Sequence, residues 1–190
     1  MLDRRKAIAT LMANRPKDLF VVPGLGSTTY DMASLGEKDQ DFYLWGAMGG
    51  AAMIGLGLAL AKPSVKVAVI TGDGEMLMGM GSLATIGVQR PANLAIVVFD
   101  NQHYGETGMQ PSHTDSGVDL VGVARACGIR QTLEVQDQAS LETLAALLGS
   151  FHETLFARVR IAADEPTRVL PSKDGVELKL RFRRAVAAAG

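Results

Sequence analysis

Cysteine, excess charge and long apolar runs are all scarce in this sequence. Cys127 is the single cysteine among 190 residues, so no disulfide can form within one chain, and we assign it to the core. The longest apolar run, 46–61, is shorter than the roughly 20 residues that a membrane-spanning helix needs. Residues 1–5 lead into no apolar signal-peptide region. We therefore expect a cytoplasmic protein without a membrane segment.

The charged residues are balanced in number and scattered along the chain. Nineteen Lys and Arg residues against 20 Asp and Glu residues give a formal net charge of −1. Because the basic side chains do not cluster, the sequence argues against nucleic acid or an anionic membrane surface as the main partner. Small molecules and other proteins remain as ligands.

Short apolar runs alternate with helical stretches, a pattern typical of βαβ units. The predicted strands are 19–22, 42–44, 65–71, 94–99, 129–135 and 155–161. The predicted helices are 2–14, 47–61, 76–89, 120–127 and 140–148. Two of the strands are almost continuously apolar, as parallel strands covered on both faces are. We predict an α/β fold: an open, mostly parallel six-stranded sheet with helices on both faces.

The length and the 47% hydrophobic content favour one domain with one substantial core. We place this domain at 1–163. The composition then changes, and 164–190 is predicted to be a charged tail.

Two polar clusters directly follow the two most apolar strands. They are 71–75, with the sequence TGDGE, and 100–102, with the sequence DNQ. The carboxyl ends of parallel strands meet at one edge of the sheet, so the clusters should lie together. Carboxylate and amide oxygens suit Mg²⁺, and glycine turns let backbone N–H groups approach a diphosphate. Either cluster alone could be an ordinary turn, but the pair favours a metal and diphosphate site.

The order Gly72-Asp73-Gly74 and then Asn101 resembles the signature of enzymes that depend on thiamine diphosphate (ThDP). The resemblance implies that Asp73 and the Asn101 side chain bind Mg²⁺. It adds the backbone carbonyl of His103 as a third protein ligand. Gly72 would belong to the same cofactor turn.

The diphosphate, by the same resemblance, meets the backbone of Gly74 and Glu75, and Tyr104 and Gly105 follow as further cofactor contacts. Many members of the family have a small serine or alanine in place of Glu75. Its carboxylate must turn away from the phosphates to avoid repulsion, so we expect only its backbone to bind.

A second segment, Gly46-Ala47-Met48-Gly49, resembles the Gly-Ser-Met-Gly stretch of this family. The match implies that the Gly46 carbonyl accepts a hydrogen bond from the 4′-amino group of the cofactor, with Ala47 beside it. Met48 would be the apolar wedge that bends the cofactor. The alternative is that Met48 is core on an apolar helix.

Within the family, the chain resembles sulfopyruvate decarboxylase β subunits and the C-terminal part of phosphonopyruvate decarboxylases over about 18–128. This implies ThDP- and Mg²⁺-dependent decarboxylation of a 2-oxo acid. Acetolactate-synthase-type carboligation and a non-catalytic ThDP-fold subunit remain alternatives. Departures at Gln102, His103, Glu106 and Met109 leave the substrate open.

The loop after the metal cluster carries three candidate acid or base groups, His103, Glu106 and His113. A histidine with an ordinary pKa can give or take a proton near neutral pH. We take His103 and Glu106 as candidate catalytic residues. The alternative is that all three are solvated loop residues.

One part of the ThDP machinery is missing from the sequence. The family activates its cofactor with a glutamate from a second, pyrimidine-binding domain of similar size, and this chain has no room for one. Glu37 lies in a short polar loop and does not fill that role. The resemblance therefore implies a separate α subunit that supplies the glutamate.

The segment 79–84 also fits the dinucleotide fingerprint G-x-G-x-x-A. That fingerprint opens a helix directly after a strand. Here 72–74 already occupies this turn, so we reject a nicotinamide-binding domain.

Overall fold

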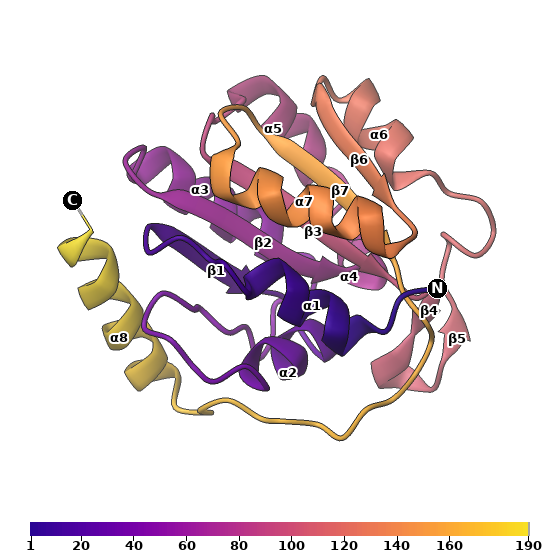
Figure 1. The fold of residues 1–190 in the computed structure, drawn as a ribbon, viewed down its shortest axis with the longest axis horizontal. Helices are drawn as coiled ribbons and strands as arrows, with labels where there is room; N and C mark the ends of the chain where they lie inside the picture. The colour runs from indigo at the N-terminus through magenta and orange to yellow at the C-terminus, as the bar shows by residue number, and fades with distance from the viewer. Residues whose placement is uncertain (190) are drawn as a thin grey trace.

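The centre of the protein is a parallel sheet, which a computed structural model describes together with the rest of residues 1–189. The strand order is β1-β2-β3-β7-β6 (Figure 1). Their bounds are Leu19–Pro23 for β1, Lys66–Gly72 for β2, Leu94–Asp100 for β3, Leu155–Arg160 for β7 and Gln131–Val135 for β6. The predicted α/β class with a mostly parallel sheet is confirmed.

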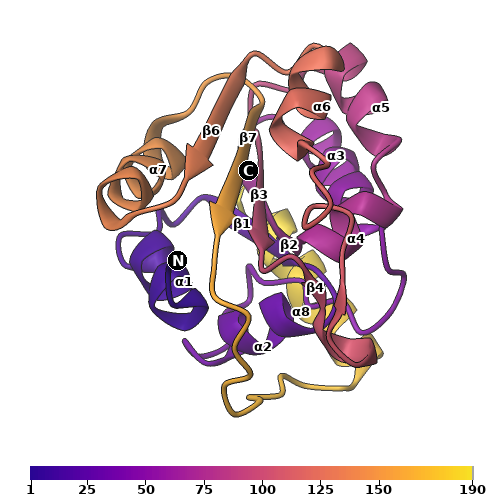
Figure 2. The ribbon, with the colours of Figure 1, turned by 90° about the vertical axis from the view of Figure 1, so that its right-hand side faces the viewer.

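Helices form a layer on each side of this sheet, as Figure 2 shows from the side. One face is covered by α1 (Arg4–Met12) and α7 (Gln138–Ser150), and the other by α3 (Ala51–Ala61), α5 (Ser82–Gln89) and α6 (Leu120–Ala126). Because both faces are covered, every residue of β3 is buried. The central strands β2 and β3 are almost continuously apolar because each one packs into a hydrophobic core on both of its faces.

The start of α1 lies at the carboxyl edge of the sheet. Leu2 forms a parallel bridge with Ile161, just beyond the end of β7. Asp3 then caps the helix by accepting the Lys6 backbone N–H at 2.9 Å. Arg4, the first helical residue, is consequently placed beside the ends of the strands and not beside their beginnings.

The predicted strand 42–44 is wrong as a sheet strand, so the sheet has five strands and not six. The segment lies along the free edge of β1 and is joined to it by individual backbone hydrogen bonds. The Val21 N–H donates to the Gln40 carbonyl and the Phe42 N–H to the Val21 carbonyl, each at 2.9 Å. Only one isolated bridge, Val21 to Asp41, results. The segment covers the edge of β1 without continuing the ladder.

Glycines alter two of the predicted helices. The predicted helix 76–89 is split into α4 (Asp73–Met78) and α5, because Gly79 packs against Gly49 so closely that a Cβ would lie 2.3 Å from the Gly49 carbonyl oxygen. The predicted helix 47–61 begins only at Ala51. Ala47 and Gly49 both have positive φ, 59° and 89°, which a right-handed helix does not accommodate.

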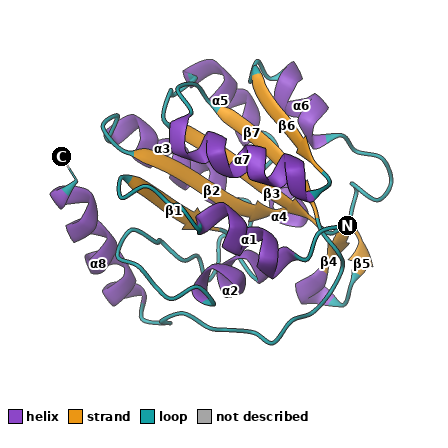
Figure 3. Ribbon diagram, in the orientation of Figure 1, coloured by secondary structure: helices purple, strands orange, loops and turns teal. Residues whose placement is uncertain are grey.

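Several elements were not predicted, and the short ones among them lie near the carboxyl edge. They are α2 (Ser27–Ala33), the hairpin of β4 (His103–Tyr104) and β5 (Gln110–Pro111), the 3₁₀ turn Gly105–Thr107 between them, and α8 (Gly175–Ala188). Figure 3 shows how little regular structure connects them. No helix of residues 1–189 is long and apolar enough to cross a membrane.

The tail leaves the end of β7, crosses the carboxyl edge and ends in α8 beside β1 (Figure 1). Its path is fixed by contacts with the body. The Trp45 indole N–H donates to the Ser172 carbonyl at 2.8 Å, and the Phe182 ring centroid lies 5.6 Å from that of Phe20 and 5.1 Å from that of Phe42. The tail therefore packs on the body. The domain limits 1–163 and 164–190 stay a prediction.

Removing the Phe182 ring should show how much α8 contributes to stability. Phe182 is 9% exposed, and Phe→Ala at a buried position costs about 3–5 kcal/mol of unfolding free energy. Val176→Ala on the same helix is the control, because Val176 is 60% exposed and surface changes stay within about 0.5 kcal/mol. Urea unfolding measures both variants. Equal, small losses would mean that α8 does not stabilise the body.

Candidate functional site: a pocket at the carboxyl edge of the sheet

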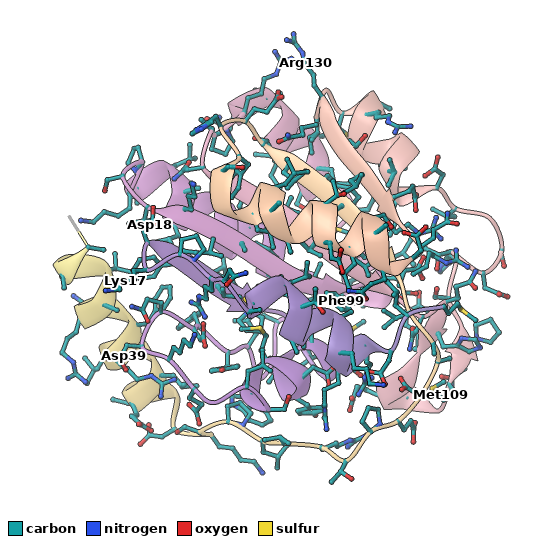
Figure 4. All side chains as sticks on the ribbon, in the orientation of Figure 1. Lys17, Asp18, Asp39, Phe99, Met109 and Arg130 are labelled. Atoms are coloured by element: carbon teal, nitrogen blue, oxygen red, sulfur yellow. The ribbon has the colours of Figure 1, made fainter. Side chains whose placement is uncertain are left out.

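A pocket of about 170 Å³ opens where β1, β2 and β3 end. Its wall is formed mainly by the residues that follow these strands, within 25–28, 72–75 and 101–107. In Figure 4, Phe99 marks the end of β3 and Met109 the hairpin beyond it, whereas Lys17 and Asp18 lie before β1 at the opposite edge. The two polar clusters of the sequence are thus brought to one pocket.

Asp73 is the buried acid of this pocket. It is the first residue of α4 and is only 2% exposed. Its Oδ2 accepts hydrogen bonds from the hydroxyls of Ser112 and, at 3.3 Å, Thr114. Burial raises the pKa of Asp73 to about 6, although the Ser112 hydrogen bond opposes the shift. The Asp73 carboxylate is therefore buried without a cationic side chain beside it among residues 1–189.

Asn101 and His103 contribute oxygens on the opposite wall. The Asn101 Oδ1 accepts the His103 backbone N–H at 2.9 Å, and the His103 ring Nδ1 lies 2.9 Å from the Asn101 carbonyl oxygen. Pro111 stands opposite His103 in the hairpin. The Ser112 N–H donates to the Gln102 carbonyl at 2.7 Å, so His103 and Pro111 form a non-hydrogen-bonded pair and the His103 carbonyl points away from the partner strand.

The donor set fits a hard divalent cation. Among residues 1–189, no group of three or more His, Cys, Asp or Glu side chains is placed to hold a metal ion. The pocket instead combines the Asp73 carboxylate with the amide and carbonyl oxygens of Asn101 and His103. Oxygen ligands of this kind suit Mg²⁺.

The Glu75 side chain turns toward the loop after β1. Its Oε2 accepts the Leu25 N–H at 3.0 Å and the Thr71 hydroxyl at 2.8 Å, while Oε1 is buried without a hydrogen-bond partner among residues 1–189. Burial raises the pKa of this carboxyl. The carboxylate thus ties the loop after β1 to the end of β2. That only the Glu75 backbone meets a diphosphate stays a prediction.

Met48, Gly74 and Tyr104 pack together at the pocket mouth. A Cβ on Gly74 would lie 2.7 Å from the Tyr104 ring, so the close approach requires glycine. Met48 is 37% exposed and lines the pocket, which is not the environment of a core methionine. Gly46 and Ala47 lie on the exposed loop before it and are not part of the pocket wall.

The candidate acid and base groups do not all reach the pocket. His103 and Glu106 line it together with Gly105, whereas His113 is exposed and contacts the Tyr104 hydroxyl at 3.0 Å. Glu106 also lies 3.4 Å from Arg168 of the tail. The catalytic roles of His103 and Glu106 stay predictions.

Other polar residues of the site were not found from the sequence. Ser112 and Thr114 hold Asp73, and Thr114 also donates to Asp100 Oδ1 at 2.8 Å. Asp100 is fully buried and paired with Arg158 at 2.6 Å. Sequence offered one usable signal, the Ser112-His113-Thr114 spacing that sends both hydroxyls to the same side of an extended segment.

Comparison with protein families gives one match that covers most of the chain. Residues 24–154 match the model of the thiamine pyrophosphate enzyme C-terminal TPP binding domain. This range contains Asp73, Asn101, Met48 and both hydroxyl residues.

Individual relatives agree with the family match. The chain is 41% identical to phosphonopyruvate decarboxylase of Streptomyces viridochromogenes over 87% of its own length, but spans only 38% of that protein. It is 39% identical to sulfopyruvate decarboxylase subunit beta of Methanocaldococcus jannaschii, with 94% of each chain covered. The solved benzoylformate decarboxylase of Polynucleobacter necessarius shares the fold with a TM-score of 0.72 and 22% identity, over 87% of this chain and 34% of that one.

The contact between Gly24 and Glu75 can be tested by a double-mutant cycle. A Cβ at position 24 would lie 1.8 Å from Glu75 Oε2, so Gly24→Ala must push the carboxylate off its two donors. We expect a loss of about 1–3 kcal/mol of unfolding free energy. In a Glu75→Ala background the same change should cost about 1 kcal/mol less, because those hydrogen bonds are already gone.

The control is Gly57→Ala, where nothing lies within 4 Å of the new Cβ and helix propensity favours alanine. Urea unfolding of the four Gly24/Glu75 combinations measures the coupling. Strictly additive losses would contradict the contact.

Proposed function

Because this chain belongs to the family of thiamine pyrophosphate enzymes, through their C-terminal TPP binding domain, we propose that it is the diphosphate- and Mg²⁺-binding subunit of a ThDP-dependent 2-oxo acid decarboxylase. The observation that carries the proposal is the pocket itself. It joins the buried Asp73 carboxylate, the Asn101 amide and the His103 carbonyl at the ends of β2 and β3. The relatives named decarboxylases support the reaction class.

Each wall of the pocket has a part in this function. Asp73, Asn101 and the His103 carbonyl would hold Mg²⁺, which joins the protein to the diphosphate, and the backbone of Gly74 and Glu75 would contact the phosphates. Met48, exposed at the mouth, would support the cofactor from below as an apolar wedge. Bound ThDP supplies the electron sink that lets a 2-oxo acid lose CO₂. The glutamate that activates it is not among these residues.

We therefore propose a separate pyrimidine-binding α subunit as partner. The chain spans only 38% and 40% of the two phosphonopyruvate decarboxylases, but 94% to 98% of sulfopyruvate decarboxylase β subunits. The names of these β subunits support a heteromer, and both groups of relatives support a 2-oxo acid with a second acidic group. A cytoplasmic location remains a prediction.

Replacing Asp73 should remove cofactor binding. Asp73→Ala takes away the only carboxylate that we assign to the metal, so we expect no measurable ThDP binding in the presence of Mg²⁺ by calorimetric titration. Asp115→Ala, an exposed aspartate of the same region, should leave the Kd unchanged. An unchanged Kd for Asp73→Ala, with its circular dichroism spectrum intact, would disprove the metal site.

The isolated chain should bind the cofactor without activating it. We expect slow proton–deuterium exchange at C2 of ThDP, measured by NMR, because no carboxylate of this chain is assigned to N1′. Adding the α subunit should raise the rate by about two orders of magnitude or more. Fast exchange in the isolated chain would mean that one of its own carboxylates activates the cofactor, and the heteromeric model would be dropped.

A further inference from the structure

A buried arginine from the first helix reaches the wall of the pocket. Arg4 is 5% exposed, and it lines the pocket alongside Ser27, Asn101 and Glu106. Among the lining residues it is the single lysine or arginine, against four carboxylates, those of Asp31, Asp73, Glu75 and Glu106. The pocket that should accept an anionic cofactor thus contains one permanent positive charge.

The acid beside Arg4 is shared with a second arginine. The Arg4 Nε lies 3.0 Å from Asp31 Oδ2, and Arg5 Nη2 lies 3.2 Å from Asp31 Oδ1. Arg5 is not part of the pocket wall and also donates to the Thr167 carbonyl at 2.8 Å. One buried carboxylate therefore faces two guanidinium groups. The other nearby acid, Asp164, is 3.9 Å from Arg4 and partly exposed.

The hydrogen-bonding capacity of Arg4 is not used up by Asp31. The Nε is buried without a partner of hydrogen-bond geometry among residues 1–189, and both ion pairs of Arg4 have their closest contact through this atom. A guanidinium has five N–H donors in a rigid fork, which matches carboxylate and phosphate oxygens. Burying such a group without acceptors is costly, so an anion in the pocket would complete it.

We propose that Arg4 binds an anionic oxygen group in this pocket, either the cofactor diphosphate or the acidic group of the substrate. The proposal rests on the proposed function for the identity of the anion. Asp31 is the positioning residue, because its Oδ2 lies 3.0 Å from the Arg4 Nε and both side chains line the pocket. Arg5 is bound to the same carboxylate from outside, which makes it a matched control.

The test compares Arg4→Gln and Arg4→Lys with Arg5→Gln. Calorimetry on the full chain measures the Kd of inorganic pyrophosphate and of ThDP, each with Mg²⁺, and steady-state kinetics of the assembled enzyme give KM and kcat for the 2-oxo acid. We expect Arg4→Gln to weaken binding or raise KM about tenfold or more. Arg4→Lys should keep part of the binding affinity, because it keeps the charge but not the fork of donors. Arg5→Gln should change Kd and KM by no more than about twofold.

The readouts separate the two sources of the anion. Weaker pyrophosphate binding in Arg4→Gln assigns Arg4 to the diphosphate, whereas unchanged pyrophosphate binding with a raised KM assigns it to the substrate. If pyrophosphate affinity and KM match those of Arg5→Gln and only the melting temperature falls, Arg4 is a structural ion pair and the proposal is overturned. Arg4-dependent pyrophosphate binding without any ThDP binding would instead disprove the proposed function and leave the anion site standing.

Discussion

Two carboxylates are buried side by side at the carboxyl ends of β2 and β3, and the rest of the site depends on how their charges are held. Asp100 is fully buried and Asp73 is 2% exposed, and the Thr114 hydroxyl contacts both, at 2.8 Å and 3.3 Å. Asp100 is paired with Arg158 at 2.6 Å. Asp73 has hydroxyl donors but no cationic side chain. Buried carboxylates without a partner are costly. The fold balances the Asp100 charge with Arg158, whereas Asp73 is the acid that we propose as a metal ligand.

This difference explains why the hairpin matters. Residues 112–114 follow β5 and return to Asp73, 39 and 41 residues away in sequence, so the loop that carries Asn101 is closed over the acid. Asp100 fixes the other end, since its Oδ1 accepts the Gln102 backbone N–H at 2.9 Å. The oxygens of Asn101 and His103 are thus held between two fixed points. For the proposed metal this matters, because a site that is organised before its ligand binds loses less entropy on binding.

The sequence predicted most of the sheet because its signals are local. Continuous apolar runs identified β2 and β3, and the glycine and acid residues after them located the pocket. It wrongly predicted a strand at 42–44. Three apolar residues cannot show whether a segment pairs fully with its neighbour or only touches the edge of β1, as this one does. It also missed the break between α4 and α5, where Gly79 meets Gly49, a contact between segments 30 residues apart. Helix α8 was missed because the charged composition of 164–190 was taken as a tail, although Leu178, Phe182 and Val186 recur at helical spacing and pack on the core.

The site was predicted less completely, for the same physical reason. Asp73, Asn101 and Glu75 lie in short motifs at strand ends, so their residue types and spacing are informative. Ser112 and Thr114 contact Asp73 from a distant segment, and Arg4 joins the pocket wall from another. An isolated hydroxyl or arginine in sequence has many ordinary roles. Glu75 shows both sides of this limit: repulsion predicted that its carboxylate turns away, but only the fold reveals Leu25 and Thr71 as its donors.

The pocket that we propose as the anchoring half of a ThDP site is held together by contacts within one chain. Its acids, amide oxygens and glycine turns are held by contacts within one chain, whereas Met48 of its wall, at 37%, and Met78 of the adjoining pocket, at 66%, are exposed. Exposed apolar side chains beside a concave site are typical of surfaces that another protein covers. The buried acids are held by contacts inside this chain. Water would be excluded from the mouth of the pocket only when the proposed partner covers it. Such a division would let the subunit bind its cofactor first and restrict chemistry to the complex, where the reacting atoms are protected from solvent.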